Sequence, residues 1–295
     1  MTPFDVVGLT PLMARTSGRP DITIALIDGP VALDHPDLAA QQIREIAASR
    51  PAACTDRSSV ACAHGTFVAG MLAGKRRSVA PAICPGCSFL SRPIFPETPA
   101  RNGEQPSATP EELAAAIVDS VRGGARILNL GVNLTQPSGR GDASLAEALN
   151  FASSRGAIPV TAAANQGVEA DSVLTRHPWV LPVVASDNAG RPIENSPLST
   201  TVGRRGISAP GIGITSLGAS GKPVTMSGTS AATGFVTGAI ALLWSELPAL
   251  TASDLRFALT NAPLQRRASV VPPMLNAWAA YQALSWDRRA AAVTR

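Results

Sequence analysis

Charged and aromatic side chains are scarce in this sequence of 295 residues. Charged residues make up 16% of the chain, against a typical value of roughly 25%, and aromatic residues make up 4%. A buried core must therefore be built mainly from Ala, Val, Leu and Ile. Because these side chains are small, they allow helices to pack closely on a sheet.

Long apolar runs are missing as well. No run approaches the roughly 18 residues that a membrane span needs, and the N-terminus lacks a basic region followed by an apolar core. We therefore expect no membrane partner and, without a signal peptide, a cytoplasmic location. A chain trimmed of its leader would look the same, so a secreted mature form stays open.

The sequence also lacks a concentrated patch of positive charge. Its net charge is +4, and its adjacent arginines are scattered pairs at 76–77, 204–205, 266–267 and 288–289. This distribution excludes a basic stripe of the kind that binds nucleic acid. We expect no nucleic-acid partner, and the sequence gives no indication of an oligomeric state.

Linkers and internal repeats are absent too. No Pro/Gly/Ser-rich segment or change in composition divides the chain, and its length suits one large α/β domain. We predict a single domain over residues 5–285 and a C-terminal tail over residues 286–295.

What the sequence does contain is an alternation of strand-like and helix-like patterns. Such interleaving favours a parallel sheet covered on both faces. The sequence therefore predicts an α/β fold with three layers and a doubly wound, mostly parallel sheet. The predicted strands are residues 22–27, 89–94, 127–130, 158–163 and 181–185, and the predicted helices are 64–72, 111–122, 144–155 and 230–246.

A Gly-Thr-Ser turn at residues 228–230 leads into the last of these helices. Ser230 at a helix start would lie among unpaired backbone N–H groups and the positive end of the helix dipole, which suit a nucleophile that leaves an oxyanion nearby. Taken alone, this turn is equally well explained as an ordinary N-cap.

Partners for Ser230 occur earlier in the chain. Asp28 follows the apolar strand 22–27, and His64 stands at the amino end of the small-residue helix 64–72. Either could separately be a turn or helix-start residue. Asp, then His, then Ser is one of three unrelated chain orders of the acid–base–nucleophile triad, the order found in subtilisin.

The segments around these three residues resemble the subtilisin-like serine proteases (subtilases, peptidase S8 family). Residues 24–29, 64–70 and 227–233 each match the family's motif around one triad member, and residues 161–167 resemble its Ala-Ala-Gly-Asn-x-Gly segment. The resemblance spans nearly the whole chain. Residues 7–12 and 28–36 are closer to the cyanobactin-maturation, PatA-like branch, which implies processing of a ribosomal peptide precursor.

The resemblance implies a role for each residue of the site. Ser230 attacks the scissile carbonyl, His64 moves the proton, Asp28 holds the imidazole, and Asn165 donates to the oxyanion. The expected activity is that of a serine endopeptidase on an extended peptide or protein substrate. Loss of Asn165 should lower turnover by roughly a hundred- to a thousandfold, as at other oxyanion holes.

The resemblance also implies where the substrate binds. A backbone edge formed by Asn129, Leu130 and Gly131 would pair with the peptide, and Ala163, Ala164 and Gln166 would shape the specificity pocket. Two of these residues depart from the family pattern, which has Ser at the position of Asn129 and Gly at that of Ala164.

Two further departures lie beside the nucleophile. Gly234 stands where the family has Pro, and Phe235 stands where His is frequent. Losing a proline frees a backbone N–H and relaxes a fixed φ, so we expect a shifted helix start. Whether the acyl-enzyme goes to water or to an amine stays open.

Four cysteines, Cys54, Cys62, Cys84 and Cys87, flank the helix that begins at His64. Disulfides, free thiols and a zinc site built on the C-x-x-C pair are the three alternatives, and a bridge would brace the histidine. Calcium is frequent in the family, yet no Asp-rich loop with alternating oxygen ligands occurs here. We expect no required metal or other cofactor.

Two other function classes remain. A catalytically silent subtilase-like module that binds peptides would be expected to lack a triad residue, whereas all three are present. An α/β-hydrolase would need a Gly-x-Ser-x-Gly elbow, which the residues around Ser230 do not form. The remaining histidines, His35 and His177, precede prolines, and we place His35 in a loop and His177 near the pocket rim.

Overall fold

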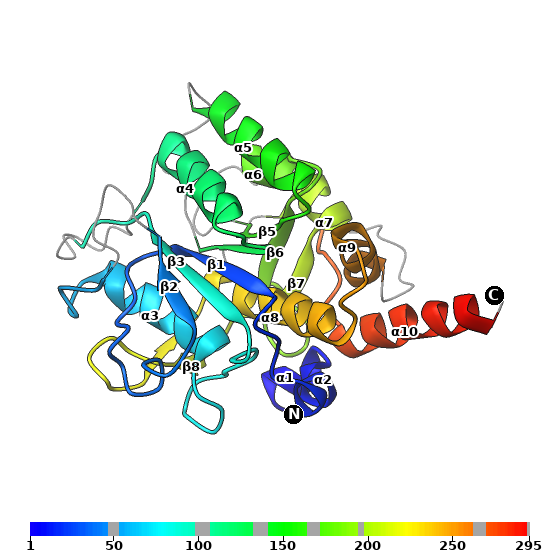
Figure 1. Cartoon of the computed structure of the whole chain (residues 1–295), viewed down its shortest axis with the longest axis horizontal. Helices are drawn as coiled ribbons and strands as arrows, with labels where there is room; N and C mark the ends of the chain where they lie inside the picture. Colours follow the sequence, from blue (N-terminus) through cyan, green and yellow to red (C-terminus); the bar gives the residue numbers. More distant parts are fainter. Residues whose placement is uncertain are drawn as a thin grey trace.

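The computed structural model of the chain describes residues 1–46, 53–97, 107–131, 141–163, 172–193, 198–261 and 270–293. For residues 287–293 only the backbone is described. Helices and strands alternate through these ranges, as Figure 1 shows. Among the described residues, none of the helices combines the length and the apolar character needed to cross a membrane.

A seven-stranded sheet forms the middle of the molecule. Its strand order is β2-β3-β1-β4-β5-β6-β7, and every neighbouring pair is parallel. A two-stranded antiparallel hairpin, β8–β9, lies apart from it. The strands are β1 (Thr23–Asp28), β2 (Ile43–Glu45), β3 (Ser88–Pro93), β4 (Ile127–Leu130), β5 (Ile158–Ala162), β6 (Leu181–Ser186), β7 (Ile207–Pro210), β8 (Ile214–Ser216) and β9 (Val224–Met226).

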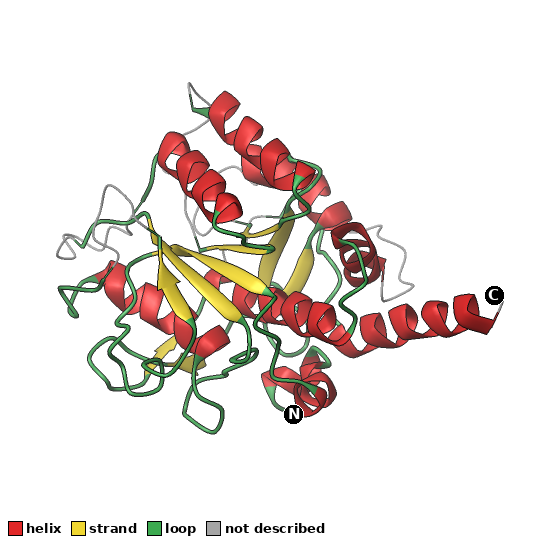
Figure 2. Ribbon diagram, in the orientation of Figure 1, coloured by secondary structure: helices red, strands yellow, loops and turns green. Residues whose placement is uncertain are grey.

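Helices cover both faces of the sheet (Figure 2). Helices α4, α5 and α6 lie over one face, and α3 and α8 lie over the other. The helices are α1 (Pro3–Val6), α2 (Leu9–Arg15), α3 (Val60–Ala73), α4 (Pro110–Arg122), α5 (Asp142–Ser154), α6 (Val173–Arg176), α7 (Thr200–Arg205), α8 (Thr229–Glu246), α9 (Ala252–Asn261) and α10 (Ala277–Val293). The predicted three-layer, doubly wound α/β fold is confirmed.

Strand β1 shows how the sequence supplies two cores from one strand. Ile24 and Leu26 join the core under α3 and α8, while Ala25 and Ile27 join the core under α4 and α5. This is the alternation of side chains along a strand whose two faces are both covered. Since β1 lies between β3 and β4, the chain reverses its direction of growth across the sheet at this strand. Open α/β sheets bind ligands at such a switch point, beyond the carboxyl ends of the strands.

Helices α3 and α8 both run away from the carboxyl edge of the sheet. The chain leaves α3 and enters the amino end of β3. The turn before α8 bonds to the residue after β7, through Gly228 N to Gly211 O at 2.8 Å, whereas Trp244 near the end of α8 lies under the Arg126 guanidinium, just before β4. Both helices therefore begin at the edge where Asp28 ends β1.

The element boundaries refine the predictions. All five predicted strands and all four predicted helices exist, most of them within two residues of the expected ends. The exception is α3, which begins at Val60 and is capped by Ser59, so His64 lies one turn inside the helix instead of at its amino end. The short strand β2, the hairpin β8–β9 and helices α1, α2, α6, α7 and α10 were not predicted.

The C-terminal helix crosses the predicted end of the domain. Helix α10 continues from Ala277 to Val293. The division into a domain over residues 5–285 and a tail over 286–295 stays a prediction.

Candidate active site

Asp28 and His64 are joined by a hydrogen bond at the carboxyl edge of the sheet. The distance between Asp28 Oδ1 and His64 Nδ1 is 2.6 Å, and Gly29 N donates to the same carboxylate oxygen at 2.6 Å. The Asp28 side chain is 1% exposed and that of His64 is 23% exposed. The carboxylate is therefore buried behind an imidazole that solvent can reach, which is the arrangement of an orienting acid and a general base.

The surroundings of His64 determine its charge. Burial favours the neutral ring, but the charge of Asp28 and its hydrogen bond together outweigh burial and raise the pKa of His64 above its ordinary value of 6.5. The second carboxylate oxygen, Asp28 Oδ2, is buried and has no hydrogen-bond partner among the described residues. With little solvation of its own, this carboxylate stabilises a positive imidazole more strongly than it would in water.

Glycines allow α3 to come this close to β1. A Cβ built on Gly29 would lie 1.9 Å from the Ala61 carbonyl oxygen, and one on Gly65 would lie 2.3 Å from the Gly29 carbonyl oxygen. Backbone therefore packs directly on backbone where α3 crosses the turn after Asp28. This contact holds His64 over the carboxylate. Neither Gly29 nor Gly65 was predicted to have a role, although each directly follows a triad candidate.

Gly131 forms the wall beside this pair. An added Cβ there would lie 2.0 Å from Asp28 Oδ2 and 3.4 Å from His64 Cε1. Gly131 N also donates to Ile27 O at 3.2 Å, so the end of β4 is fixed to the end of β1. Any larger residue at this position would displace the carboxylate.

Ser230 is the second residue of α8, and its side chain is partly exposed. The N-cap is Gly228, which has φ 148° and no side-chain cap. Ser230 is therefore not the N-cap, so the alternative explanation of the Gly-Thr-Ser turn, in which Ser230 caps the helix, is wrong. The turn is held by the Gly228–Gly211 bond and by Gly213 N, which donates to Ser227 Oγ at 2.9 Å.

Gly234 has a packing role where the family has proline. A Cβ at Gly234 would lie 2.9 Å from Met71 Cε, so this position is where α8 packs on α3. The adjacent Phe235 is buried and lies against Phe4, with ring centroids 5.6 Å apart. The expected shift of the helix start stays a prediction, while Gly234 allows close contact between the two helices that carry Ser230 and His64.

Asn129 and Leu130 of the predicted substrate edge lie within the sheet, and their contact with a peptide stays a prediction. Both residues belong to β4, are fully buried, and lie in register with β1 on one side and β5 on the other. Asn129 Oδ1 accepts a hydrogen bond of 2.8 Å from Thr237 Oγ1 of α8, so its side chain points into the core. β4 is paired on both sides, and Gly131, at the strand's end, lies directly beside Asp28 and His64.

The predicted specificity pocket is described only in part. Ala163 follows β5 and is fully buried against Val184 and Val202. Ala164, Asn165 and Gln166 lie outside the described residues, so their predicted roles stay predictions.

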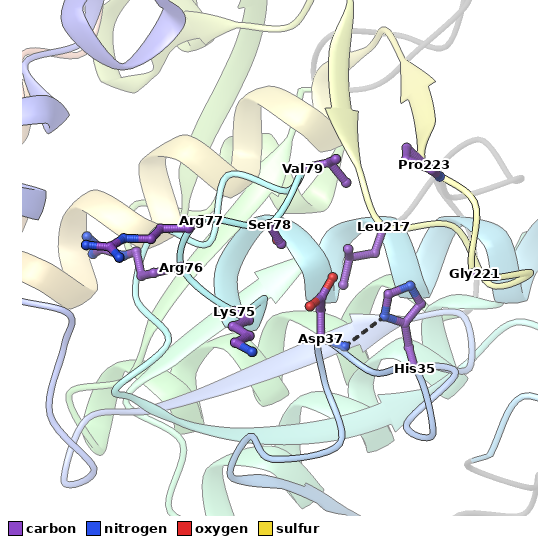
Figure 3. Close-up of a pocket in the computed structure, with 10 residues that line it drawn as sticks. All are labelled: His35, Asp37, Lys75, Arg76, Arg77, Ser78, Val79, Leu217, Gly221 and Pro223. Carbon is purple, nitrogen blue, oxygen red and sulfur yellow. Dashed lines mark hydrogen bonds between the residues drawn. The ribbon is translucent and has the colours of Figure 1, made fainter.

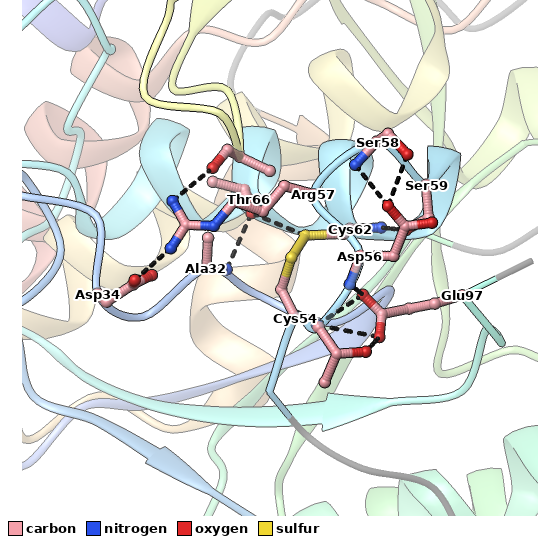
Figure 4. The surroundings of a disulfide bond; sticks show 12 residues. Ala32, Asp34, Cys54, Asp56, Arg57, Ser58, Ser59, Cys62, Thr66 and Glu97 are labelled. Carbon is pink, nitrogen blue, oxygen red and sulfur yellow. Dashed lines mark hydrogen bonds and ion pairs between the residues drawn. A yellow bond between two sulfur atoms is a disulfide. The ribbon is translucent and has the colours of Figure 1, made fainter. Parts of the chain in front are cut away.

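Cys54 and Cys62 form a disulfide (Figure 4). Cys62 lies on α3 two residues before His64, and the Cys54 loop is held by the Glu97 carboxylate, which accepts from Thr55 N at 2.9 Å and from Asp56 N at 2.9 Å. The expected brace of the histidine helix is therefore present. A zinc site that uses all four cysteines is wrong, because two of the sulfurs are bonded to each other.

Cys84 and Cys87 remain thiols and are fully buried. Burial raises the pKa of the Cys84 thiol well above its ordinary value. The hydrogen bond with Cys84 lowers the pKa of the Cys87 thiol. Both side chains pack in the core beneath α3 and α8.

The other two histidines lie away from Asp28. His35 lines a cavity of about 640 Å³ at the far end of α3, together with Asp37, Lys75 and Arg77 (Figure 3). His177 precedes β6 and bonds through Nε2 to Asn150 Oδ1 at 3.2 Å. Since the amino end of β6 lies at the edge opposite the site, the expectation that His177 borders the substrate pocket is wrong.

Comparison with known proteins identifies the family. The profile of the subtilase family (peptidase S8) matches residues 19–277. The thermostable alkaline protease of Halalkalibacterium halodurans is 29% identical over 234 residues, which cover 79% of this chain and 59% of that protein. The chain therefore spans less than two thirds of the length of this relative.

Two solved structures share the fold over almost their whole length. A mutant of the protease domain of PatA is 30% identical with a TM-score of 0.80, and the match covers 92% of this chain and 97% of that domain. The prenylagaramide maturation protease PagA is 27% identical, also with a TM-score of 0.80, and the match covers 94% and 98%. The predicted similarity to the PatA-like branch is confirmed, and the chain belongs to the subtilase family.

Proposed function

We propose that this chain is a serine endopeptidase with Asp28, His64 and Ser230 as its triad. The observation that carries the proposal is the buried Asp28–His64 hydrogen bond of 2.6 Å, at the edge of the sheet where α8 presents Ser230. In this arrangement Nδ1–H donates the hydrogen bond that Asp28 accepts, which leaves His64 Nε2 as the basic nitrogen.

The proposed reaction begins with His64 taking the proton of the Ser230 hydroxyl while Oγ attacks the scissile carbonyl. Asp28 stabilises the imidazolium that forms. The oxyanion accepts hydrogen bonds from the Ser230 backbone N–H, which lies in the first turn of α8, and from the proposed donor Asn165. Collapse of this intermediate passes the proton to the leaving amine, and a second nucleophile releases the acyl group.

The proposed substrate is an extended segment of a ribosomal peptide precursor. Two relatives that match nearly the whole chain support it, since PagA is described as a prenylagaramide maturation protease and PatA contributes a protease domain of the same fold. The second nucleophile is proposed to be water. Transfer to an amine would give a ligated or cyclised product instead.

Covalent labelling with a fluorophosphonate, mapped by mass spectrometry, tests the proposal. Label on Ser230 that disappears in the His64→Ala variant supports the triad. An unlabelled wild-type protein would overturn the proposal in favour of a silent peptide-binding module. The mass of the peptide product then separates the two fates of the acyl group, because a cyclised product lacks the one water that hydrolysis adds.

The disulfide bears on the compartment in which the chain works. Structural disulfides persist in oxidising environments and are rare in the cytosol. The Cys54–Cys62 bond supports the secreted form over the cytoplasmic location that the sequence suggested. Alkylation of free thiols in intact cells before extraction tests this, since a cytosolic protein would be alkylated at Cys54 and Cys62.

A further inference from the structure

Helix α8 is buried along most of its length and is rich in small residues. Its first part contains Ala231, Ala232, Gly234, Gly238 and Ala239, all buried. Neighbouring side chains insert at its glycines, since an added Cβ would lie 2.9 Å from Met71 Cε at Gly234 and 2.5 Å from Ile83 Cγ2 at Gly238. These contacts are apolar, whereas a hydrogen bond between two side chains is directional and fixes one position of α8 along the sheet.

The Asn129–Thr237 hydrogen bond is a contact of this kind. Both side chains are fully buried, and the bond joins β4 to α8 at 2.8 Å. Two other buried hydroxyls of α8 form bonds within the helix, Thr233 to Thr229 O at 2.7 Å and Ser245 to Ala241 O at 2.7 Å. Ser245 also bonds to Cys87, just before β3, so among these three hydroxyls that of Thr237 is the one that bonds to a residue within a strand.

The bond is aligned with the candidate site at both ends. Thr237 follows Ser230 by seven residues, which places the two on one face of α8 about 10 Å apart. Asn129 precedes Gly131 by two residues, and Gly131 lies directly against Asp28. A shift of α8 at Thr237 would therefore move Ser230 relative to the Asp28–His64 pair.

The amide of Asn129 is a costly residue to bury. Its Nδ2 has no hydrogen-bond partner among the described residues. A leucine of similar size would avoid the desolvation cost of that donor. A single buried polar contact in an apolar interface is known to fix register at the expense of stability.

We propose that the Asn129–Thr237 hydrogen bond sets the position of α8 along β4 and thereby the distance from Ser230 to His64. The inference rests on the proposed function. Asn129 and Thr237 are positioning residues, because neither side chain reaches the surface at which a substrate would bind.

The test compares four variants of the full chain on one peptide substrate. Thr237→Val removes the hydroxyl at nearly constant volume and should lower kcat by about ten- to a hundredfold with little change in KM, as a small misplacement of reacting groups does. Thr237→Ser restores the hydroxyl and should restore kcat. Ser245→Ala removes a buried hydroxyl that bonds to Ala241 O and to Cys87 at the far end of α8, and it should leave kcat unchanged.

The fourth variant combines Asn129→Leu with Thr237→Val. It leaves no unpaired polar group, so it should unfold at a temperature equal to or above that of the wild type and still show the low kcat. A double variant that is as active as the wild type would overturn the proposal. So would equal kcat values for Thr237→Val and Ser245→Ala.

Amide hydrogen exchange in the first turn of α8 supplies a readout that does not depend on turnover. Exchange should be faster in Thr237→Val than in Ser245→Ala, and equal rates would overturn the proposal. An unlabelled wild-type protein combined with the expected exchange difference would refute the proposed function and leave the positioning role standing.

Discussion

The two helices that carry His64 and Ser230 are attached to the sheet by different means. The start of α3 is held by the Ser59 cap, the Cys54–Cys62 disulfide and the bond from His64 to Asp28. The start of α8 has no side-chain cap, and α8 packs on its neighbours through small residues. His64 is thus fixed by a side-chain cap, a disulfide and a carboxylate within two turns of it, whereas the turn before Ser230 is held by the Gly228–Gly211 and Gly213–Ser227 hydrogen bonds and the rest of α8 by packing.

The Asp28→Asn variant should show the largest effect, because it breaks the polar attachment of α3. An amide in place of the carboxylate holds the wrong tautomer of His64 and cannot stabilise the imidazolium. We expect kcat to fall by about ten-thousandfold while the fold stays intact, as in other triads. Steady-state kinetics with circular dichroism as the control for folding checks this, and a loss of less than tenfold would contradict the assigned role.

Alanine substitutions at Gly29 and at Gly234 compare two close contacts. Gly29 packs against a rigid backbone, and Gly234 packs against a flexible side chain. At Gly29 the new Cβ meets the Ala61 backbone oxygen at 1.9 Å, which no side-chain rotation relieves, so we expect a loss of about 3 kcal/mol in the free energy of unfolding. At Gly234 it meets the end of the flexible Met71 side chain, and alanine's better helix propensity offsets about 1 kcal/mol of strain.

Denaturant titration of both alanine variants, made in the inactive Ser230→Ala background to prevent self-cleavage, measures these changes. The comparison fails if Gly234→Ala proves as destabilising as Gly29→Ala.

Opening the disulfide should weaken the attachment of α3 to a smaller extent. The loop between Cys54 and Cys62 is short, so removing the bond should cost about 2–3 kcal/mol in the free energy of unfolding, chiefly by freeing the unfolded chain. The Cys54→Ser variant, measured against Cys84→Ser as a control that removes a buried thiol, should unfold at a temperature several degrees lower. No change upon adding a reductant to the wild type would contradict the brace.

The pH dependence should show the smallest effect. The raised pKa of His64 places the acid limb of kcat/KM above pH 6.5, because the neutral imidazole is the active base. In the Asp28→Asn variant the limb should move to lower pH. An acid limb that stays at the same pH in this variant would show that the charge of Asp28 does not raise the pKa of His64.

The same shift makes a prediction for stability. Since the pKa is raised on folding, the ion pair contributes fully below the unfolded pKa of about 6.5, and its contribution is lost as the pH rises through the higher folded value. Thermal unfolding of the Ser230→Ala variant across this window, compared with the same variant carrying Asp28→Asn, isolates the contribution of the pair.

Much of the fold and half of the site could be predicted because their signals are local. Apolar runs bounded by turn residues predicted strands β1 and β4 to within a residue, and the start of α4 was predicted to within one residue. The motifs around Asp28 and His64 could likewise be recognised, because each lies within one short segment.

The errors came from contacts between distant segments. His177 was expected at the rim of the substrate pocket, yet it precedes β6 at the opposite edge of the sheet, and strand order is not encoded in any one strand. The predicted start of α3 was four residues late. The helix begins after the Ser59 cap, and its first turn is attached by the Cys54–Cys62 disulfide, whose pairing hydrophobic periodicity does not reveal.

The sequence by itself determined which residue types this protein has for acyl transfer and in which order they occur, because each lies in a short motif with its own turn or helix signal. Only the tertiary structure decided which cysteines pair, why glycine stands at 131 and 234, and what fixes α8 on the sheet. These properties are distances between segments far apart in the chain, and such distances exist only once the sheet has brought those segments together.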